Sequence, residues 1–556
     1  MHNKITAQFN LLYEPWITIR KKDSSRKEVS ILGVFKEAHE FLALSGELPA
    51  QDTAILRILL AILHSVFNKF AEPYSALDKW AELWSAKQFP YEEIEQYLKG
   101  YEDRFYLIHP QAPFFQIPGL DTQAHFGPFN MAKLNGEVSE SDHKARLFQH
   151  RSGDEKVTLS FAEAARWLLY FNAYAETFGK LEAKGKKGKS DLSVGVGWLG
   201  KLGLITALGD SLFETLMLNF VLLDESGALW DRGRPIWEKP VCFKERNAIA
   251  IPRNQAELLT LQSRRVLLEN NGERVTAYRF ISGDIFPKEE SFSETMTAWK
   301  FTKQPGDKTE RYRPKTFQQS VQLWRDFASL VSQNESARMP GVVQWLKRLV
   351  EEKDENGDRL LPVDFKYFRF QTSSILYGTM QAVIADVFSD SISFNSELLS
   401  DLHRDWIPRI IDELETTENL VRHVGILAQN IAKAAGNKYG HAEREHGLAQ
   451  RHDASSQAYY RLDQPFRKWL ESIEPKIENT GKMMDDKCGE WWGESQSIVR
   501  SLGKEIVSNC SPQALTGRNG LSAPQAFNWF LYNTTNRAIV KWKGGEKNGK
   551  SAKNSA

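Results

Sequence analysis

The chain has 556 residues, of which 41% are hydrophobic and 26% charged, so it has the composition of a soluble globular protein and is long enough for two or more domains. The formal net charge is only +1, which excludes a generally basic nucleic-acid binder, so any nucleic-acid role must depend on local patches or on partner subunits. Three scattered cysteines without a CxxC motif exclude a disulfide framework and a cysteine zinc site, and they fit a cytoplasmic protein.

The first predicted element is a β-hairpin. Aromatic and β-branched residues run from 9 to 19 (FNLLYEPWITI), and a polar turn follows at residues 21–27 (KKDSSRK). Residues 28–31 (EVSI) are then typical of the return strand.

Two helices are expected in the first 200 residues. Apolar residues at three- and four-residue spacing predict a buried helix over 52–67, with Asp52 or Thr53 as its N-cap. The same spacing predicts a helix over 157–175, in which Ser160 is the expected N-cap. Further on, residues 258–320 alternate β-branched segments with Gly and Pro turns, which predicts short strands.

After about residue 395 the strand-like pattern gives way to long helical periods. Four apolar stripes predict four amphipathic helices, and hence an antiparallel bundle, within residues 411–434, 459–473, 498–506 and 527–538. The small polar residues that end the chain predict a disordered tail. We therefore predict an α+β fold, with a large mixed domain of short β-sheets and helices over 1–395 and a C-terminal four-helix bundle with its tail over 396–556.

Glycine motifs in the region 179–200 indicate a nucleotide-dependent enzyme as an alternative. Residues 195–200 (GVGWLG) match GxGxxG, but no convincing buried strand precedes them and no βαβ rhythm surrounds them. Residues 183–190 (AKGKKGKS) end like a phosphate-binding loop, but Ala183 replaces the first glycine. Both motifs therefore lack part of the pattern that nucleotide binding requires.

The same stretch is rich in lysine. Lys184, Lys186, Lys187 and Lys189 are spaced by glycines and could neutralise phosphates along a DNA backbone. A solvated surface loop is the other interpretation, and the sequence leaves both open.

No catalytic chemistry can be assigned from the remaining motifs. The histidines of residues 441–446 (HAEREH) lie five apart, whereas metal ligands on one helical face are three or four apart. No GxSxG motif, Cys/His arrangement or acid and base pair is found. We predict no catalytic residue, metal site or cofactor. No run of 18 apolar residues or signal-like start is present, so no membrane association is expected either.

Three aromatic-rich stretches resemble those of a known family. Residues 9–19, 103–110 (DRFYLIHP) and 113–116 (PFFQ) are similar to the CasA family. The similarity extends over the whole chain and is also strong in 145–220, 258–265 and 368–375. That family provides the large subunit of the type I-E CRISPR surveillance complex, Cascade, which checks double-stranded DNA for a short flanking motif. The resemblance implies a DNA-reading subunit and not an enzyme. The large subunit of a related type I complex stays open as an alternative.

In that family the N-terminal domain reads the protospacer-adjacent motif from the minor groove. The resemblance places its glycine loop at Phe178, Gly179 and Lys180, where the missing side chain of glycine lets the backbone approach base edges. It places the basic finger at Arg279, whose cation would meet the negative potential of the groove.

The resemblance also implies a polar wedge and an RNA contact. Gln371 and Thr372 are the expected wedge at a hairpin tip, which would hold the first target pair open; an ordinary polar turn is the other interpretation. Phe148 matches a loop that touches the crRNA handle and a neighbouring subunit, although a core position would suit it equally.

The implied partners are those of an assembly. They are the crRNA-bound backbone, handle-binding and small subunits of Cascade, the double-stranded target DNA, and the helicase-nuclease that is recruited once the guide has paired with its target. The C-terminal bundle would contact the small subunits.

Overall fold

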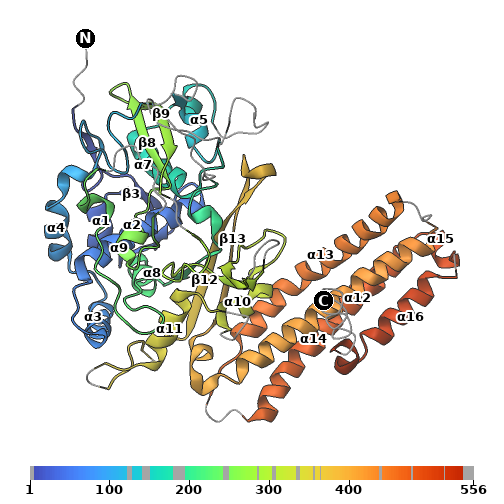
Figure 1. The fold of residues 1–556 in the computed structure, drawn as a ribbon. Coiled ribbons are helices and arrows are strands. Elements are labelled where there is room, and N and C mark those ends of the chain that lie inside the picture. The colour runs from blue at the N-terminus through green and yellow to red at the C-terminus, as the bar shows by residue number, and fades with distance from the viewer. Residues whose placement is uncertain are drawn as a thin grey trace. The chain divides into compact units, whose positions relative to one another are not determined.

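The computed structural model divides the chain into two compact units. The first comprises residues 1–323 and 329–391, and the second comprises residues 324–328 and 392–556. Small sheets and helices make up the first unit and a helical bundle the second, which confirms the α+β prediction (Figure 1). The division falls after Ser391, whereas the sequence placed it after residue 395. The structure describes residues 6–121, 128–138, 140, 151–178, 195–241, 249–284, 287–303, 309–332, 338–354, 357–362, 365–436, 441–476 (backbone only for 441–446), 480–518 and 520–541.

The opening stretch forms two strands and a turn instead of one long strand. β1 (Gln8–Asn10) pairs with β5 (Tyr106–Ile108). The Asn10 side chain then accepts a hydrogen bond from the Leu12 N–H at 3.0 Å, which turns the chain before β2 (Ile17–Lys21) begins.

The predicted hairpin is formed by β2 and β3 (Arg26–Val29), and β4 (Phe41–Leu44) joins the other edge of β2. The return strand is shorter than expected. Ser30 caps α1 (Ile31–Glu37) by accepting from the Gly33 N–H at 3.1 Å, so the helix begins where the strand was predicted to continue.

The helix expected over 52–67 is α2 (Pro49–Phe67), and its predicted N-cap is wrong. Leu48 is the N-cap and Pro49 starts the first turn, because its fixed φ suits that position. The Asp52 carboxylate instead accepts from the Gly46 N–H at 2.8 Å. Within the described part of the chain α2 is the one helix long and apolar enough to cross a membrane, but 89% of that apolar window is buried, as in a core helix.

Asp52 gives the first unit a pH dependence. Burial raises the pKa of this carboxyl to about 7, above its value in an unfolded chain. The folded state therefore holds the proton more tightly, and this group's contribution to stability declines as pH rises from about 4 to 7. We expect Asp52→Asn, which keeps an acceptor for Gly46, to gain stability relative to the parent more at pH 8 than at pH 5 in thermal unfolding. The exposed Asp23 serves as the control, since Asp23→Asn should show no such gain, and an equal gap at both pH values for Asp52→Asn would contradict the assignment.

The helix expected over 157–175 is α7 (Phe161–Tyr174), and its N-cap is confirmed. Ser160 accepts from the Glu163 N–H at 3.2 Å while the Glu163 carboxylate accepts from the Ser160 N–H at 2.8 Å, forming a capping box. α7 packs against α2 and against β8 (Arg264–Asn270). The end of α7 is therefore fixed in the core of the unit.

The short strands expected over 258–320 are present. β8 and β9 (Val275–Ser282) form a sheet with β6 (Phe129–Asn130), and β10 (Trp299–Thr302) pairs with β11 (Arg311–Pro314). A further sheet has the order β13-β12-β7. Its strands are β7 (Leu204–Leu208), β12 (Tyr367–Tyr377) and β13 (Ile384–Asn395). The other α-helices before the bundle are α3 (Pro73–Ala86), α4 (Tyr91–Lys99), α5 (Met131–Leu134), α6 (Asp154–Val157), α8 (Leu212–Leu218), α9 (Gln255–Leu258), α10 (Ala328–Val331) and α11 (Gly341–Glu351).

The bundle is built from the four predicted helices and one short addition. They are α12 (Trp406–Ala434), α13 (His441–Glu471), α14 (Gly481–Ser508), α15 (Pro512–Thr516) and α16 (Ala523–Asn533). α12 packs against α13, α14 and α16, which lie side by side in Figure 1. Trp324 joins this unit because its indole stacks on Phe466 with ring centroids 4.6 Å apart. The predicted tail lies, from residue 542 on, outside the described residues.

Candidate nucleic-acid interface

The turn that joins β12 to β13 is exposed and strained. We call residues 378–383 the tip turn; its backbone is closed by bonds from Gly378 N to Val383 O and from Gln381 N to Gly378 O, both 2.9 Å. Met380 and Gln381 have φ of 55° and 57°, a region that residues other than glycine rarely adopt. Met380 is 80% exposed, so burial of its side chain does not explain the conformation. Strain held at an exposed turn is typical of a functional site.

The predicted wedge residues do not lie at this tip, so that part of the prediction is wrong. Gln371 and Thr372 lie inside β12, opposite Thr206 and Ile205 of β7. Thr372 is buried, and its hydroxyl lies 3.4 Å from that of Ser374. The polar run at 371–374 continues the strand because β7 pairs with it, so the turn comes later.

The segment that follows α7 contacts the tip turn. The Thr177 N–H donates to the Gln381 carbonyl at 2.9 Å, and the Ile384 N–H donates to the Glu176 carboxylate at 3.2 Å. The Tyr377 hydroxyl donates to the Tyr174 carbonyl at 2.8 Å. The start of the predicted glycine loop and the tip turn are therefore neighbours, although about 200 residues of sequence separate them.

Phe178 is the described part of the predicted glycine loop. Its ring packs on Phe280 of β9 with centroids 4.8 Å apart, and the Lys133 ammonium lies 3.8 Å from its centroid. The ring therefore anchors the segment on the β8–β9 sheet. Gly179 and Lys180, the lysines at 184, 186, 187 and 189, and Phe148 lie outside the described residues, so their roles stay predictions.

The structure does not place Arg279 on a finger. It lies in β9, where its Nε donates to the Glu269 carboxylate on β8 at 2.6 Å. An arginine whose charge is matched across a strand pair is poorly suited to enter a groove. The prediction rested on the arginine's presence in residues 270–290, and a sequence does not show that Glu269 faces it.

The hairpin of β10 and β11 has the properties expected of a basic finger. Lys300 and Lys303 are exposed, and neither has an ion pair within the part of the chain that the structure describes. Phe301 and Tyr312 pack across the hairpin with ring centroids 5.2 Å apart, which stiffens it. The alternation of lysine with aromatic residues in 299–303 (WKFTK) was the signal for these residues in the sequence.

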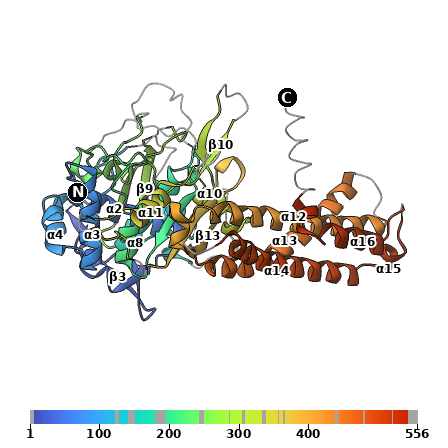
Figure 2. The ribbon, with the colours of Figure 1, turned by 90° about the horizontal axis from the view of Figure 1, so that it is seen from below.

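The two hairpins extend past the same end of β7. Leu204 of β7 bridges to Thr297 in antiparallel fashion, and Ala298 N then donates to Gly203 O at 2.9 Å as the chain enters β10. Ser373 of β12 is also paired antiparallel with Leu204. The segments that lead into the two hairpins therefore leave β7 in the same direction. In Figure 2 the β10 hairpin projects from the side of the unit opposite to β3.

The glycine motif at 195–200 has a structural role. A Cβ on Gly197 would lie 2.3 Å from the Ala173 carbonyl, and one on Gly200 would lie 2.1 Å from the Tyr377 hydroxyl. The Gly197 N–H donates to Ala175 O at 2.8 Å, and the Trp198 N–H donates to the Ser263 hydroxyl at 2.9 Å. These N–H groups are thus already bonded and do not form the phosphate cradle that a dinucleotide site requires.

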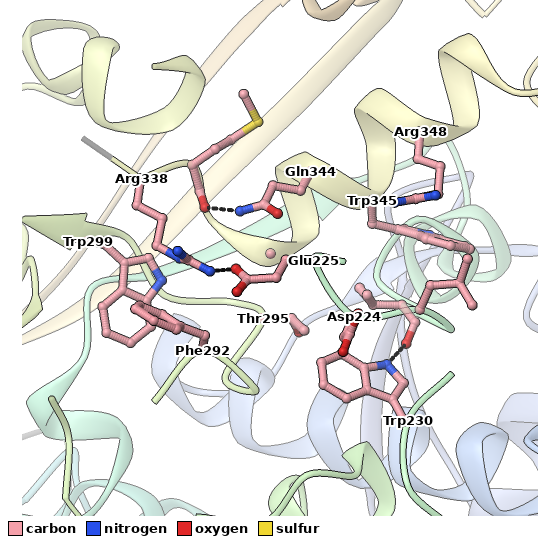
Figure 3. Close-up of a pocket in the computed structure, with 14 residues that line it drawn as sticks. Asp224, Glu225, Trp230, Phe292, Thr295, Trp299, Arg338, Gln344, Trp345 and Arg348 are labelled. Atoms are coloured by element: carbon pink, nitrogen blue, oxygen red, sulfur yellow. Dashed lines mark hydrogen bonds and ion pairs between the residues drawn. The ribbon is translucent and has the colours of Figure 1, made fainter. Parts of the chain in front are cut away.

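A pocket lies between α11 and the residues around Phe292 and Trp299 (Figure 3). The two arginines that line it interact with other side chains of the protein. Arg338 forms an ion pair with Glu225 and stacks on Phe292 at 3.5 Å from the ring centroid, while Arg348 donates to Glu352 at 2.6 Å. Within the described residues no cluster of three or more His, Cys, Asp or Glu side chains could hold a metal ion.

Comparison with known proteins assigns the family. The family model described as CRISPR-associated protein Cse1 matches residues 10–501. This chain belongs to the Cse1 family. A curated relative named CasA/Cse1, from Thermus thermophilus, is 27% identical over 445 residues, covering 79% of this chain and 80% of the relative. The resemblance to the CasA family is therefore confirmed.

Solved structures agree with this assignment. Cse1 from Thermobifida fusca has a TM-score of 0.80 at 31% identity, covering 97% of this chain and 98% of that chain. A chain of a structure described as a CRISPR RNA-guided surveillance complex has a TM-score of 0.68 at 17% identity, covering 96% of this chain and all of that chain, which shows a shared fold.

The stretches that resemble the family form hydrogen bonds inside the first unit of this Cse1 chain. The Trp16 indole N–H donates to Leu11 O at 3.0 Å within the first stretch. The Gln116 amide donates to Leu107 O at 2.7 Å and accepts from the Leu268 N–H at 2.8 Å, which ties the third stretch to β8. The stretches that resemble the Cse1 family thus stabilise the fold, and they do not include the tip turn.

Proposed function

We propose that this chain is the large subunit of a CRISPR surveillance complex, and that it reads the motif flanking a target duplex and starts to unwind that duplex. The observation that carries this proposal is the strained, exposed tip turn bonded to the start of the predicted glycine loop. Membership of the Cse1 family and the fold shared with a chain of an RNA-guided surveillance complex support it.

The tip turn takes the role that the sequence gave to Gln371 and Thr372. Gln381 is exposed at the turn, and its amide offers two donors and an acceptor that can replace hydrogen bonds of an opened base pair. Met380, which precedes it, offers an apolar surface to an unstacked base. Insertion must offset an unstacking cost of a few kcal/mol, and contacts to the flanking motif supply that free energy.

Within this proposal Lys300 and Lys303 replace Arg279 as the basic finger. The minor groove presents acceptor-rich base edges and a negative potential that attract a long cation. Both lysines project from a hairpin that leaves β7 in the same direction as the tip turn. The three elements could then meet one duplex flank together.

Partners and setting follow from the same proposal. The chain would act in the cytoplasm, bound to the crRNA-carrying backbone, handle-binding and small subunits, and would help recruit a helicase-nuclease without being an enzyme itself. Guide pairing supplies sequence specificity, so the protein needs to read only the flank. The nearly neutral net charge suits a subunit that binds DNA as part of an assembly.

A flank selection with the assembled complex tests this function. Target duplexes with randomised flanking bases are bound to complexes with and without this chain, and the retained sequences are compared. We expect a narrow set of flanks only when the chain is present. Equal flank preference in the absence of the chain would refute the proposal. The backbone subunits that purify with the chain would distinguish a type I-E complex from a related type I complex.

The paired substitution Lys300→Gln and Lys303→Gln should weaken duplex binding and lower its salt dependence, because two cations are removed from the negative potential of the groove. Each neutralised phosphate that is lost lowers the slope of log affinity against log salt by about 0.9, so a drop of about 1 to 2 is expected from the pair. The matched control is Lys22→Gln with Lys27→Gln on the β2–β3 hairpin, on the other side of the unit (Figure 2). Equal slopes for the two double variants in salt titrations would contradict the finger.

A further inference from the structure

Arg264 is a fully buried arginine that binds main-chain carbonyls on both sides of the segment 179–194. Its side chain is 1% exposed. One guanidinium nitrogen donates to Glu176 O at 3.0 Å, to Ala175 O at 3.4 Å and to Gly195 O at 2.8 Å. The residues before and after the segment are therefore held at a single point.

The position of Arg264 is itself fixed. The Asn172 amide donates to Arg264 O at 3.1 Å and accepts from the Arg264 N–H at 3.2 Å, which joins α7 to the first residue of β8. Burying a guanidinium costs free energy unless its N–H groups are hydrogen-bonded, and here main-chain carbonyls accept from it. Lysine, a single point charge on a flexible stem, cannot reproduce a rigid planar fork.

Two of the carbonyls that Arg264 binds, those of Ala175 and Glu176, belong to the segment that contacts the hairpin of β12 and β13. Residues 174, 176 and 177 bond to residues 377, 384 and 381, through the Tyr377 hydroxyl, the Glu176 carboxylate and the Thr177 N–H. The segment 174–177 thus lies between the guanidinium and the hairpin. A displacement of this segment therefore moves the acceptors of the guanidinium together with the groups that the hairpin bonds to.

We propose that Arg264 is a positioning residue that couples reading of the flank to opening of the duplex. This inference rests on the proposed function. Arg264 touches no DNA in this scheme. It holds the main chain at residues 175 and 176, so that a flank bound beside Phe178 sets the position of the tip turn through a chain of direct hydrogen bonds.

The test compares closed and pre-opened targets. Complexes carrying Arg264→Lys are assayed by a fluorescent base analogue at the first target pair, on duplexes with a favoured or a disfavoured flank and on targets with that pair mismatched. We expect the variant to open closed duplexes about tenfold less than the parent and to lose flank discrimination, while binding the mismatched target like the parent. Unchanged opening and discrimination would overturn the inference.

A second variant decides the case if Arg264→Lys fails to fold or also loses binding to the mismatched target. Tyr377→Phe removes only the hydroxyl that joins the hairpin to the end of α7. Its control is Tyr278→Phe, which removes a buried hydroxyl that bonds to neither element within the described residues. Reduced opening in Tyr377→Phe alone supports the coupling, and equal opening in the two variants overturns it. A parent complex without flank discrimination would instead refute the proposed function.

Discussion

Replacing Gln381 with glycine should slow opening of a closed target duplex by about 10- to 100-fold, which corresponds to about 1.4 to 2.7 kcal/mol of lost transition-state stabilisation. The reason is that the amide side chain is removed from the tip turn while the rest of the turn is kept. Opening is measured with the base analogue at the first target pair, and initial binding to the flank is measured separately on a duplex too short to open.

Glycine is the appropriate replacement because Gln381 has a φ of 57°. Glycine adopts this conformation without steric cost, so the turn should be at least as stable as in the parent. The Gln381 carbonyl remains and still accepts from the Thr177 N–H. An alanine at this position would add backbone strain and confuse the loss of a side chain with a distorted turn.

Two controls separate the tip turn from the earlier assignment. Ser24→Gly makes the same kind of change at the β2–β3 turn, where Ser24 has a φ of 68°, and should leave opening unchanged. Gln371→Ala tests the residue that the sequence favoured, and its position inside β12 predicts little effect on opening. A larger loss in Gln371→Ala than in Gln381→Gly would contradict the relocation of the wedge.

The wedge was misplaced because local polarity does not show where a strand ends. Residues 371–374 (QTSS) are polar enough to suggest a turn, yet they continue β12 because β7, from a distant part of the chain, pairs with them. The real turn lacks the Asn-Gly or Gly-Gly pair that positive φ normally favours. Gly378 was the available signal, followed by a return to β-branched residues at Ile384.

Helices were predicted more reliably because their signals are local. The apolar stripes of α7 and the bundle, and the Ser160 cap, depend on residues three or four apart. The extension of α2 back to Pro49 was missed because its N-cap, Leu48, has no capping side chain. The membership of Trp324 in the second unit was also missed, because it depends on a stacking contact with Phe466 far along the chain.

The buried charges that support the site were not predicted at all. Arg264 binds residues 69 to 89 positions away, and the pair of Arg57 with Glu294 spans 237 positions. No periodicity links residues at such separations. A sequence shows an arginine as a surface residue or a candidate for DNA contact, and only the fold shows which ones serve main-chain carbonyls or buried carboxylates.

The pair of Arg57 and Glu294 should have the largest effect on stability of any side-chain pair discussed. Arg57 of α2 donates to both Glu294 oxygens at 2.8 and 2.9 Å, and the two side chains are 4% and 0% exposed. The Trp198 indole donates to the same carboxylate at 3.2 Å, so the pair also supports residues 195–200, which lie against Tyr377 of β12. Glu294→Ala would leave a buried guanidinium without its counter-charge, at a cost of about 3–5 kcal/mol.

The measurement is denaturant unfolding of the full chain, with the two units fitted as separate transitions. Glu294→Ala should shift the transition of the first unit by that amount, and the double variant Arg57→Leu with Glu294→Leu should recover most of it, because no unpaired charge remains. The control is Glu82→Ala, which breaks the pair with Lys79 on α3, where Glu82 is 66% exposed and a loss below about 1 kcal/mol is expected. Similar losses at Glu294 and Glu82 would show that the buried pair does not hold this part of the core together.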